Sequence, residues 1–452
     1  MLLVLNLNVE GLEVVGHEDM VRDALHVIKK GCEVADPYVA VSRYVDVEGS
    51  LIRVGERTYS PRATHVVGFG KASLRMLEAL CGLLGDMVAG GVVISPVGGG
   101  EVCRVEVLRG DHPLPGRGTL ESSIRLIKYL ESSVSSKDLV LVLVSGGGSA
   151  LFEVPEEGLT LDDVAEVSRL LMSRGADIHE INTVRKHLSQ VKGGKLLRYV
   201  RGDVASLIIS DVVGDDLSVI ASGPTHPDRS TFMDAYNVLK AKDIYDEVPE
   251  AVRRLVEKGL KGLIKDTPKA GDPSFHRTYN IVIANNYTSL RAMEDEARSL
   301  GYNTLLLSPY ITGEAREVGK VLAGIIKSIT TLETPVRKPA ALIAGGETTV
   351  TVEGGGVGGR NQELCLSLTI EIRDAGEAVA VCFGSDGVDG VSPAAGALTS
   401  SRVLKRAIEL GLDPLTCLRS NDSYTFFNRL GLAIHTGYTG TNVNDFFVAL
   451  IK

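Results

Sequence analysis

The stretch VLVLVSGGGSAL, residues 140–151, joins an unbroken apolar run to three consecutive glycines. Near-continuous apolarity over five or six residues is typical of a strand that is buried on both faces, as in a parallel sheet. Three glycines after such a strand let the main chain approach a ligand closely and turn its N–H groups toward it. A crowded strand-to-helix turn and a turn that carries a nucleophilic serine are the alternatives.

The residues after the apolar run exclude two familiar motifs. A nucleophile elbow requires G-x-S-x-G, whereas the sequence from Gly147 to Leu151 has no final glycine. A Walker phosphate-binding loop requires G-K-[S/T], and no such triplet follows. Taken alone, the stretch leaves a phosphate cradle and a tight turn open.

The same pattern recurs along the chain, with helix-like stretches between the apolar runs. These runs cover residues 64–70, 90–95, 103–110, 139–147 and 203–211 in a first series, and 279–286, 302–309, 340–347 and 378–387 in a second. The alternation predicts an α/β fold with two α/β domains and mostly parallel sheets. A chain of 452 residues favours two domains, and a Pro/Gly/Asp-rich segment at 270–278 divides it into 1–275 and 276–452.

The composition limits the possible partners and the location. The net charge is −9 with no basic tract, so nucleic acid is not an expected partner. No apolar run reaches the roughly 18 residues of a membrane span. The six cysteines are scattered without a CxxC pair, which predicts reduced thiols and a cytoplasmic location. The first 19 residues lack a basic region and are not expected to form a signal peptide.

Small and acidic residues follow the predicted strands in both series. Asp211 and Gly146 end runs of the first series, and Gly345, Glu347 and Asp386 end runs of the second. Ligands of open α/β sheets bind beyond the carboxyl ends of the strands. These residue types favour a site for an anion and a metal over an apolar pocket.

The stretch HVVGFGKAS, residues 65–73, is half of a dinucleotide-binding fingerprint. Its third position is Ser73 rather than Gly or Ala, and the next apolar run ends without an acid for a ribose hydroxyl. We instead expect backbone N–H groups and the Lys71 ammonium to face a phosphate together. An exposed lysine at a helix start is the alternative.

Residues 179–197 predict a helix on which Arg185, Ser189 and Lys192 share one face. In an acidic chain this basic face suggests an anionic ligand. A solvated basic face is the alternative.

Two acidic turns are candidates for a divalent cation or a general base. SDVVGDD, residues 210–216, carries Asp211, and FGSDGVDG, residues 383–390, carries Asp386. Helix capping and an Asx turn, respectively, are the alternatives.

The densest motif is AGGETTVTVEGGGVGGRNQE, residues 344–363. A predicted strand ends at Gly345, a short strand follows, and a glycine loop carries Arg360 and Asn361. A planar guanidinium on a loop of close-approaching backbone is suited to bidentate binding of a phosphate or carboxylate.

The ordered set of motifs resembles the MOFRL-type glycerate kinases, specifically the glycerate 2-kinases. The resemblance runs from about residue 60 to the C-terminus and rests on GFGKAS, VSGGGSAL, INTVRKHLSQVKGGKL, GDDLSVIASGPTHPD, GGETTVTVEGGGVGGRNQE, SDGVDG, AAGA, NDSYTFF and TGTNVND. It implies ATP-dependent phosphorylation of D-glycerate at the 2-hydroxyl with Mg²⁺ or another divalent cation. It also implies an N-terminal Rossmann-like domain and a C-terminal MOFRL-type domain, with the active site in the cleft between them.

The resemblance and the strand-end pattern together predict the roles of individual residues. Lys71 and Arg360 are the expected catalytic pair, and Asp211 and Asp386 are catalytic acids and metal ligands. The glycerate-binding candidates are Arg185, Lys192 and Asn361. The residues expected to bind the ATP phosphates are Gly70, Ser145, Gly146, Gly147, Gly148, Ser149, Gly345, Gly346 and Glu347.

Two other functions remain open at this point. A hydroxypyruvate reductase that uses NAD(P)H is the first, although the incomplete fingerprint at 65–73 argues against it. A non-catalytic sensor of nucleotides or sugar acids is the second. We expect a monomer or homodimer with small-molecule partners.

Overall fold

The computed structural model describes residues 15–452 and divides into two compact units. The N-terminal unit comprises residues 37–283, and the C-terminal unit comprises residues 15–36 together with 284–452. The boundary predicted at 275/276 therefore falls after Ile283 instead. The prediction that the N-terminus is not a signal peptide concerns mainly residues 1–14, which lie outside the described residues.

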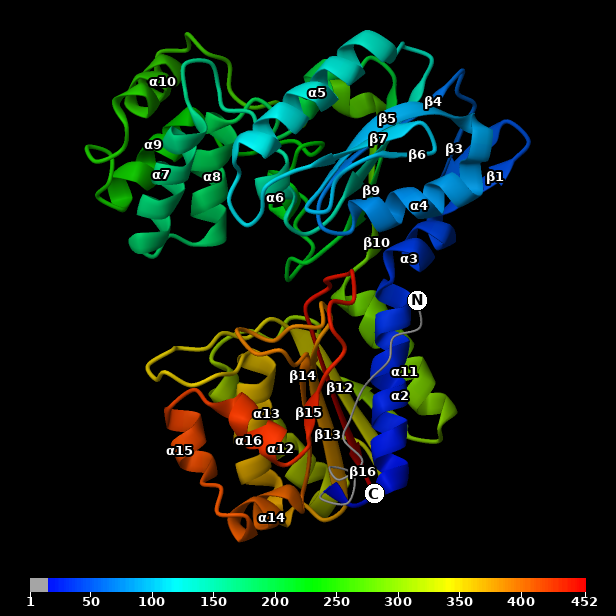
Figure 1. Ribbon diagram of the computed structural model, residues 1–452, viewed down its shortest axis with the longest axis vertical. Coiled ribbons are helices and arrows are strands. Elements are labelled where there is room, and N and C mark those ends of the chain that lie inside the picture. Colours follow the sequence, from blue (N-terminus) through cyan, green and yellow to red (C-terminus); the bar gives the residue numbers. More distant parts are fainter. Residues whose placement is uncertain (1–14) are drawn as a thin grey trace. The chain divides into compact units, whose positions relative to one another are not determined.

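The N-terminal unit contains a seven-stranded sheet with the order β10-β9-β8-β4-β5-β7-β6 (Figure 1). Its strands are β4 (Thr64–Phe69), β5 (Val88–Ser95), β6 (Glu101–Val102), β7 (Val105–Arg109), β8 (Leu139–Val144), β9 (Asp203–Ile209) and β10 (Thr278–Ala284). The five strands from β9 to β7 pair in parallel, as their continuous apolar sequences predict. The run at 279–286, predicted in the second domain, is β10 of this first sheet.

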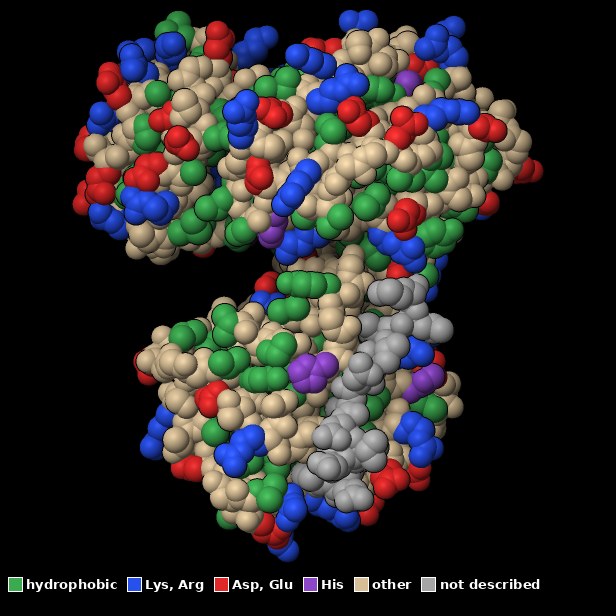
Figure 2. Space-filling model, viewed as in Figure 1, with side chains coloured by type: hydrophobic (Ala, Val, Ile, Leu, Met, Phe, Trp, Pro, Cys, Tyr) green, Lys and Arg blue, Asp and Glu red, His purple; other side chains and the backbone are tan. Residues whose placement is uncertain are grey.

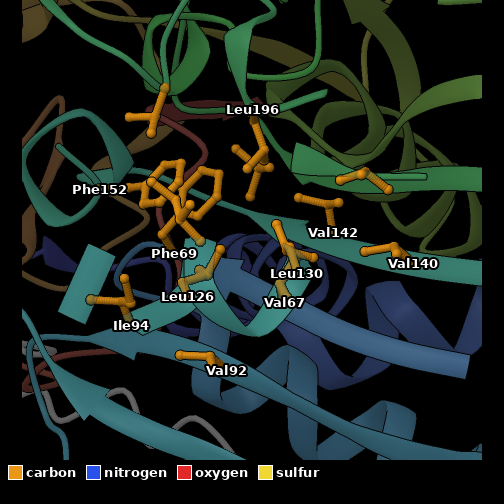
Figure 3. Close-up of a cluster of buried hydrophobic side chains, with 14 of the residues drawn as sticks. Val67, Phe69, Val92, Ile94, Leu126, Leu130, Val140, Val142, Phe152 and Leu196 are labelled. Atoms are coloured by element: carbon orange, nitrogen blue, oxygen red, sulfur yellow. The ribbon is translucent and has the colours of Figure 1, made fainter. Parts of the chain in front are cut away.

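Helices cover both faces of this sheet. The helix α4 (Ser73–Leu84) packs on one face and α5 (Arg117–Ser133) packs on the other (Figure 1). Figure 3 shows the core on the α5 side, where Phe69 of β4 stacks on Phe152 with ring centroids 4.4 Å apart. Burying a side chain of this size contributes about 1.5–3 kcal/mol, so this cluster anchors the strand ends that carry the site.

The rest of the N-terminal unit lies outside the large sheet. It consists of a three-stranded sheet and a set of helices, three of which begin with capping boxes, at Thr160, Asp177 and Thr231. A separate core holds α7 to α10 together. These elements are α3 (Pro37–Tyr44), β1 (Val45–Glu48), β2 (Leu51–Val54), β3 (Arg57–Tyr59), α6 (Gly148–Leu151), α7 (Leu161–Ser173), α8 (Ile178–Leu188), α9 (Phe232–Ala241) and α10 (Glu250–Leu260).

The C-terminal unit contains a six-stranded sheet with the order β11-β12-β16-β13-β14-β15. Its strands are β11 (Asn303–Leu306), β12 (Ala340–Gly346), β13 (Ala378–Gly384), β14 (Gly396–Ser400), β15 (Ala433–Ile434) and β16 (Asp445–Ile451). β11 and β12 are parallel, whereas β16 pairs antiparallel with both β12 and β13. The fully buried central strand β16 was not predicted, although its sequence DFFVALI is nearly all apolar.

Two helical layers enclose the C-terminal sheet (Figure 1). α2 and α11 cover one face, and α12 and α13 cover the other. The helix α2 belongs to this unit, despite its position at the start of the chain, because its buried face packs against α11 and the sheet. The helices are α2 (Glu18–Ala35), α11 (Asn286–Ser299), α12 (Ala315–Leu332), α13 (Arg360–Glu371), α14 (Val403–Glu409), α15 (Pro414–Arg419) and α16 (Ser423–Arg429).

The predicted α/β class with two domains is confirmed. No helix within residues 15–452 is long and apolar enough to cross a membrane. On the face shown in Figure 2, basic and acidic side chains are interspersed over both units rather than collected into a basic patch.

Candidate active site

In the N-terminal unit, the residues that follow the parallel strands share one edge of the sheet. The strands β9, β8, β4, β5 and β7 are neighbours in that order and run parallel, so their carboxyl ends meet there. Asp211 follows β9, Gly146 follows β8, Lys71 follows β4 and His112 follows β7. The sheet thus brings together three predicted residues and one, His112, that was not predicted.

The turn between β4 and α4 uses its own backbone amides. Gly70 has φ 135°, and a Cβ there would lie 2.2 Å from Ser145 Oγ, so glycine is required by close packing. The N–H of Lys71 donates to Gly146 O at 2.9 Å, and that of Ala72 donates to Ser145 Oγ at 3.0 Å. The expectation that these amides face a phosphate is therefore corrected, and Gly70 has a packing role. Lys71 is exposed, and within residues 15–452 its ammonium makes no hydrogen bond or ion pair.

The glycine loop after β8 supplies the amides that the β4–α4 turn lacks. Gly147 has φ 79°, a left-handed conformation that glycine adopts without strain. The Gly148 N–H donates to Ser145 O at 3.1 Å, whereas the N–H groups of Gly146, Gly147 and Ser149 find no acceptor in the described chain. Neighbouring backbone amides without acceptors form an anion-binding concavity.

Three side chains reach this glycine loop because Gly146 and Gly147 have none. A Cβ on Gly146 would lie 2.2 Å from Asp211 Oδ2. A Cβ on Gly147 would lie 3.1 Å from His112 Nε2 and 3.3 Å from Lys71 Cγ. Partial burial of the ring and the charge of Lys71 both lower the pKa of His112, which favours the neutral imidazole over the charged form.

Ser149 belongs to a short chain of polar side chains. Its Oγ lies 2.9 Å from Ser222 Oγ, and Ser222 donates to Asn182 Oδ1 at 2.8 Å. Because a serine has a single hydroxyl proton, Ser149 is the donor to Ser222. Ser149 Oγ therefore offers lone pairs to a ligand, which suits a substrate hydroxyl better than a phosphate oxygen.

The loop that carries Ser222 has an unusual backbone. Ala221 and Ser222 have φ 49° and 62°, a left-handed region that non-glycine residues rarely adopt and that is often strained at functional sites. The N–H groups of Gly193 and Gly194 donate to Ser222 O at 3.0 Å and Gly223 O at 2.8 Å. The glycine pair therefore supports this loop.

The basic helix predicted over 179–197 is shorter than expected. α8 ends at Leu188, and the next residue, Ser189, adopts an extended conformation. Lys192 therefore lies beyond the helix and does not share a face with Arg185, which corrects that prediction.

Lys192 is a buried structural residue. Its side chain is 1% exposed, and its ammonium donates to Ser149 O at 2.9 Å and Phe152 O at 2.8 Å. Its third contact is Glu153 Oε2 at 2.8 Å. Two hydrogen bonds and one ion pair hold the buried ammonium, so Lys192 fixes the end of the glycine loop and is not exposed for binding glycerate.

Arg185 remains a candidate for anion binding. It is half-buried on α8, three residues after Asn182 and therefore on the same side of the helix. Within the described residues it makes one hydrogen bond, a long one of 3.5 Å to Ser168 Oγ. Burial lowers the pKa of Arg185, and the negative charge of Glu153 partly offsets this effect. The guanidinium is therefore poorly partnered, and it lies on the side of α8 that carries Asn182 of the Ser149 chain.

In the C-terminal unit, two carboxylates hold Arg360, the first residue of α13. Its Nε and Nη2 donate to the Asp445 carboxylate at 2.6 and 3.0 Å, and its Nη1 donates to Glu347 Oε1 at 2.7 Å. Burial acts to lower the pKa of Arg360, but the two carboxylates raise it above its ordinary value. Three of the five guanidinium N–H groups are therefore engaged and the plane is fixed, so the remaining two keep a defined direction.

Asp445 forms the centre of a buried polar network. Burial raises its pKa to about 7, against the opposing effects of Arg360 and Asn361. Asn361 Nδ2 lies 3.0 Å from Asp445 Oδ1 and 3.3 Å from Asp389 Oδ1. Asn361 therefore bridges two carboxylates with its amide protons, which corrects its predicted contact with the substrate. Asp389 also accepts the Gln362 N–H at 2.8 Å and so caps α13.

The glycines at the end of β12 are explained by packing. A Cβ on Gly345 would lie 2.2 Å from Asn286 Oδ1, and one on Gly346 would lie 2.1 Å from Ile311 O. The N–H groups of Gly345 and Glu347 donate to Ser308 O and Ile311 O. Packing thus accounts for both glycines, and their contact with ATP phosphates stays a prediction. Glu347 likewise uses both oxygens within the unit, on Arg360 and on Asn444 Nδ2 at 2.9 Å.

The glycine loop before Arg360 also packs against its own unit. A Cβ on Gly354 would lie 2.2 Å from Ser420 O, and one on Gly359 would lie 2.3 Å from the Asp389 backbone. The short strand predicted in this segment is reduced to a single bridge at Thr349. The glycines thus bring the backbone close enough for the Asp389 cap to start α13 at Arg360.

The two predicted metal ligands belong to different units. Asp386 lies in an Asx turn, where its Oδ1 accepts the Val388 N–H at 3.1 Å. Asp211 presents Oδ2 at the glycine loop, in the space that a Cβ of Gly146 would fill. Residues 15–452 contain no group of three or more His, Cys, Asp or Glu side chains placed to hold a metal. Mg²⁺ is usually held by one or two carboxylates plus substrate phosphates, so either aspartate fits that role.

Sequence reasoning missed His112, Ser222 and Asp445, although Ser222 and Asp445 lie in the quoted motifs GDDLSVIASGPTHPD and TGTNVND. His112 follows the apolar run at 103–110, and Asp445 opens the apolar run of β16. The strand-end rule that selected Asp211 would have found His112 as well. Asp445 precedes its strand, so that rule does not select it.

Comparisons with known proteins agree along nearly the whole chain. Residues 23–257 match the model of a domain of unknown function, DUF4147, and residues 340–445 match that of the MOFRL family. A glycerate 2-kinase from Pyrococcus horikoshii is 41% identical over 430 residues, covering 94% of this chain and 96% of that protein. A protein from Agrobacterium vitis, provisionally named a hydroxypyruvate reductase, is 39% identical over 390 residues, covering 85% and 86%.

The fold agrees with that of a solved relative. The crystal structure of a glycerate kinase from Thermotoga maritima superposes with a TM-score of 0.86 at 37% identity. It covers 96% of this chain and 100% of that chain.

Proposed function

This chain belongs to the MOFRL-type glycerate kinase family, and we propose that it transfers the γ-phosphoryl group of ATP to the 2-hydroxyl of D-glycerate. The relatives named glycerate kinase cover nearly the full length of both units, which supports this activity. In the N-terminal unit, the observation that carries the proposal is Lys71, whose ammonium is unpartnered within residues 15–452 and whose Cγ lies beside Gly147 in the loop with open amides. Such a site suits a phosphoryl group.

The chemical demands of phosphoryl transfer match these groups. The protein mainly has to position the reactants and neutralise charge on the transferred oxygens. Lys71 and the free N–H groups of Arg360 are the proposed sources of positive charge. The loop amides of Gly146, Gly147 and Ser149 are the proposed donors to phosphate oxygens.

Binding of the acceptor is assigned to the same unit as Lys71. Arg185 is the proposed partner of the glycerate carboxylate because its guanidinium is poorly satisfied within the described residues. Ser149 is the proposed acceptor for a glycerate hydroxyl because its own proton is directed to Ser222.

Asp211 and Asp386 are the proposed ligands of the divalent cation. When bound with the nucleotide, Mg²⁺ would offset the negative charge of the phosphates. The Asp211 carboxylate at the glycine loop fits this role because the loop is also the proposed phosphate site.

A reductase is the second candidate, and the name of the Agrobacterium relative favours it. A dinucleotide pyrophosphate needs free amides at the first strand-to-helix turn. The amides of Lys71 and Ala72 are already used, and β5 ends at Ser95 rather than at an acid for the ribose. The geometry therefore supports the kinase better.

One paired assay separates the candidates. The purified chain is mixed with D-glycerate, ATP and Mg²⁺ and ADP is followed, with L-glycerate and no acceptor as controls. In parallel, oxidation of NADH and NADPH is followed with hydroxypyruvate. We expect ADP release that depends on D-glycerate, whereas cofactor oxidation alone would establish a reductase and no turnover would favour a sensor.

A cytoplasmic location and a monomeric or homodimeric state complete the proposal. All six cysteines are free, which is expected where thiols stay reduced. Size-exclusion chromatography with light scattering measures the oligomeric state directly.

A further inference from the structure

We propose that His112 is the general base that accepts the hydroxyl proton of the phosphoryl acceptor. This inference rests on the kinase function proposed above and assigns the proton transfer within it. It starts from a side chain that the sequence did not single out, at the carboxyl end of β7.

The loop that carries His112 is fixed immediately before the histidine. The Asp111 N–H donates to Thr119 Oγ1 at 2.8 Å, and the Thr119 N–H donates to Asp111 Oδ2 at 3.0 Å. Thr119 belongs to α5, so this pair ties the loop to the helix. Gly110 packs so closely on Ile94 and Leu151 that a Cβ would lie 2.8 Å from each side chain. The imidazole is therefore delivered from an ordered backbone.

The ring reaches the proposed phosphate site. The position of a Cβ on Gly147 lies 3.0 Å from His112 Cδ2, 3.1 Å from its Nε2 and 3.3 Å from Lys71 Cγ. The imidazole and the lysine stem thus flank the same glycine. Because Lys71 is the proposed partner of the transferred phosphoryl group, we infer that the hydroxyl that attacks phosphorus lies on the His112 side of this glycine.

The electrostatic surroundings keep the imidazole able to accept a proton. Partial burial and the positive charge of Lys71 lower the pKa of His112. The carboxylate of the adjacent Asp111 is directed to Thr119 and α5 rather than to the ring. A neutral imidazole is a stronger base near pH 7 than a carboxylate of ordinary pKa, and it leaves Asp211 for the cation.

The step is balanced in atoms and electrons. The acceptor's O–H bond breaks as its oxygen forms a bond to the γ-phosphorus of ATP. The bond from that phosphorus to the bridging oxygen breaks, and its electron pair leaves with ADP. The proton passes to His112 Nε2 and then to water.

The test compares the full-length wild type with His112→Gln over pH, in the D-glycerate and ATP assay. Because a general base typically contributes 10²–10⁴-fold, we expect kcat of His112→Gln to fall by about 10²–10³-fold at pH 7.5. The wild-type rate should decline as pH drops through an ionisation below about 6.5, the ordinary histidine value, since a protonated ring cannot accept the proton. Asp445 is present in both proteins, so the difference between the two profiles isolates His112. His179→Gln, an exposed histidine of the same unit, is the matched control and should retain wild-type activity.

A second variant separates proton transfer from packing. In His112→Ala, added imidazole should restore part of kcat in proportion to its neutral fraction. An unchanged ionisation in His112→Gln, a loss below about fivefold, or a defect in His112→Ala that imidazole does not restore would each overturn the proposal. Absence of glycerate-dependent ADP release by the wild type would instead overturn the kinase function.

Discussion

The two expected catalytic cations are held in opposite ways. Arg360 donates three hydrogen bonds to Asp445 and Glu347, which fix its guanidinium plane. Lys71 is exposed beside Gly147, and its ammonium has no partner within residues 15–452. Arginine is a planar, preorganised fork and lysine is a flexible point charge, so each residue matches its support. Loss of Arg360 should therefore lower both the stability of the fold and the activity, whereas loss of Lys71 should lower the activity alone.

Replacement of the unpartnered cation should give the largest effect on catalysis. In Lys71→Ala, kcat/KM should fall by on the order of 10²–10⁴-fold because transition-state charge loses its neutralising partner. The melting temperature should stay at the wild-type value, since no described contact of the ammonium is removed. Steady-state kinetics and a thermal melt of the same sample check this, and near-normal turnover in the folded variant would refute the assignment.

Replacement of the clamped cation should lower activity and stability together. Arg360→Ala should lose a similar factor, about 10²–10⁴-fold in kcat/KM, if its free N–H groups act on the phosphoryl oxygens. It also leaves Asp445 buried without its main partner, which should lower the free energy of unfolding by several kcal/mol, about 2–5. Denaturant titration checks the second effect. Equal stability of Arg360→Ala and Lys71→Ala would contradict the conclusion that only Arg360 contributes to the stability of the fold.

A third cation sharpens the contrast because it is fully buried. Lys192→Met leaves Glu153 buried and unpaired, which should cost about 3–5 kcal/mol of the free energy of unfolding. The double variant Lys192→Met/Glu153→Leu should recover part of that loss, since both charges are then absent. Urea unfolding of the three proteins measures this. A Lys192→Met protein that is stable but binds glycerate weakly would restore the substrate-binding role we have corrected.

A smaller effect is expected from loosening the clamp. In Asp445→Asn, the amide offers one acceptor oxygen where the carboxylate offers two, so Arg360 loses its bidentate support. A displacement of a catalytic group by about 1 Å can cost up to 10²-fold, and we expect kcat to fall by about 10–100-fold. Glu347→Gln is the matched control, with one bond affected and a change of only a few-fold. A larger loss in Glu347→Gln than in Asp445→Asn would contradict this order.

The sequence predicted the parallel sheet well because buried parallel strands leave a local signal. The apolar runs that became β4, β5, β7, β8 and β9 needed no knowledge of their neighbours. The placement of α2 and β10 depended on long-range packing, which no local pattern encodes. The same limit applies to the antiparallel pairing of β16 with β12 and β13.

Individual roles in the site were harder to predict than its location. Lys71 and Lys192 both sit beside glycines in the sequence, yet one is exposed and the other is buried on Glu153. Glycines in the sequence also do not indicate a single role. The loop at Gly147 leaves backbone N–H groups without an acceptor in the described chain, whereas Gly345 provides space for the side chain of Asn286. Burial and hydrogen-bond partners decide between these uses, and they arise only after folding.

The identity of the product tests the proposed reaction most directly. Phosphorus NMR of the reaction of the purified chain with D-glycerate, ATP and Mg²⁺ identifies the new phosphate monoester directly. We expect 2-phosphoglycerate, formed in step with ADP and on the order of 10²–10⁴-fold more slowly when Lys71→Ala replaces the wild type. A 3-phosphoglycerate product, or no phosphate ester at all, would contradict it.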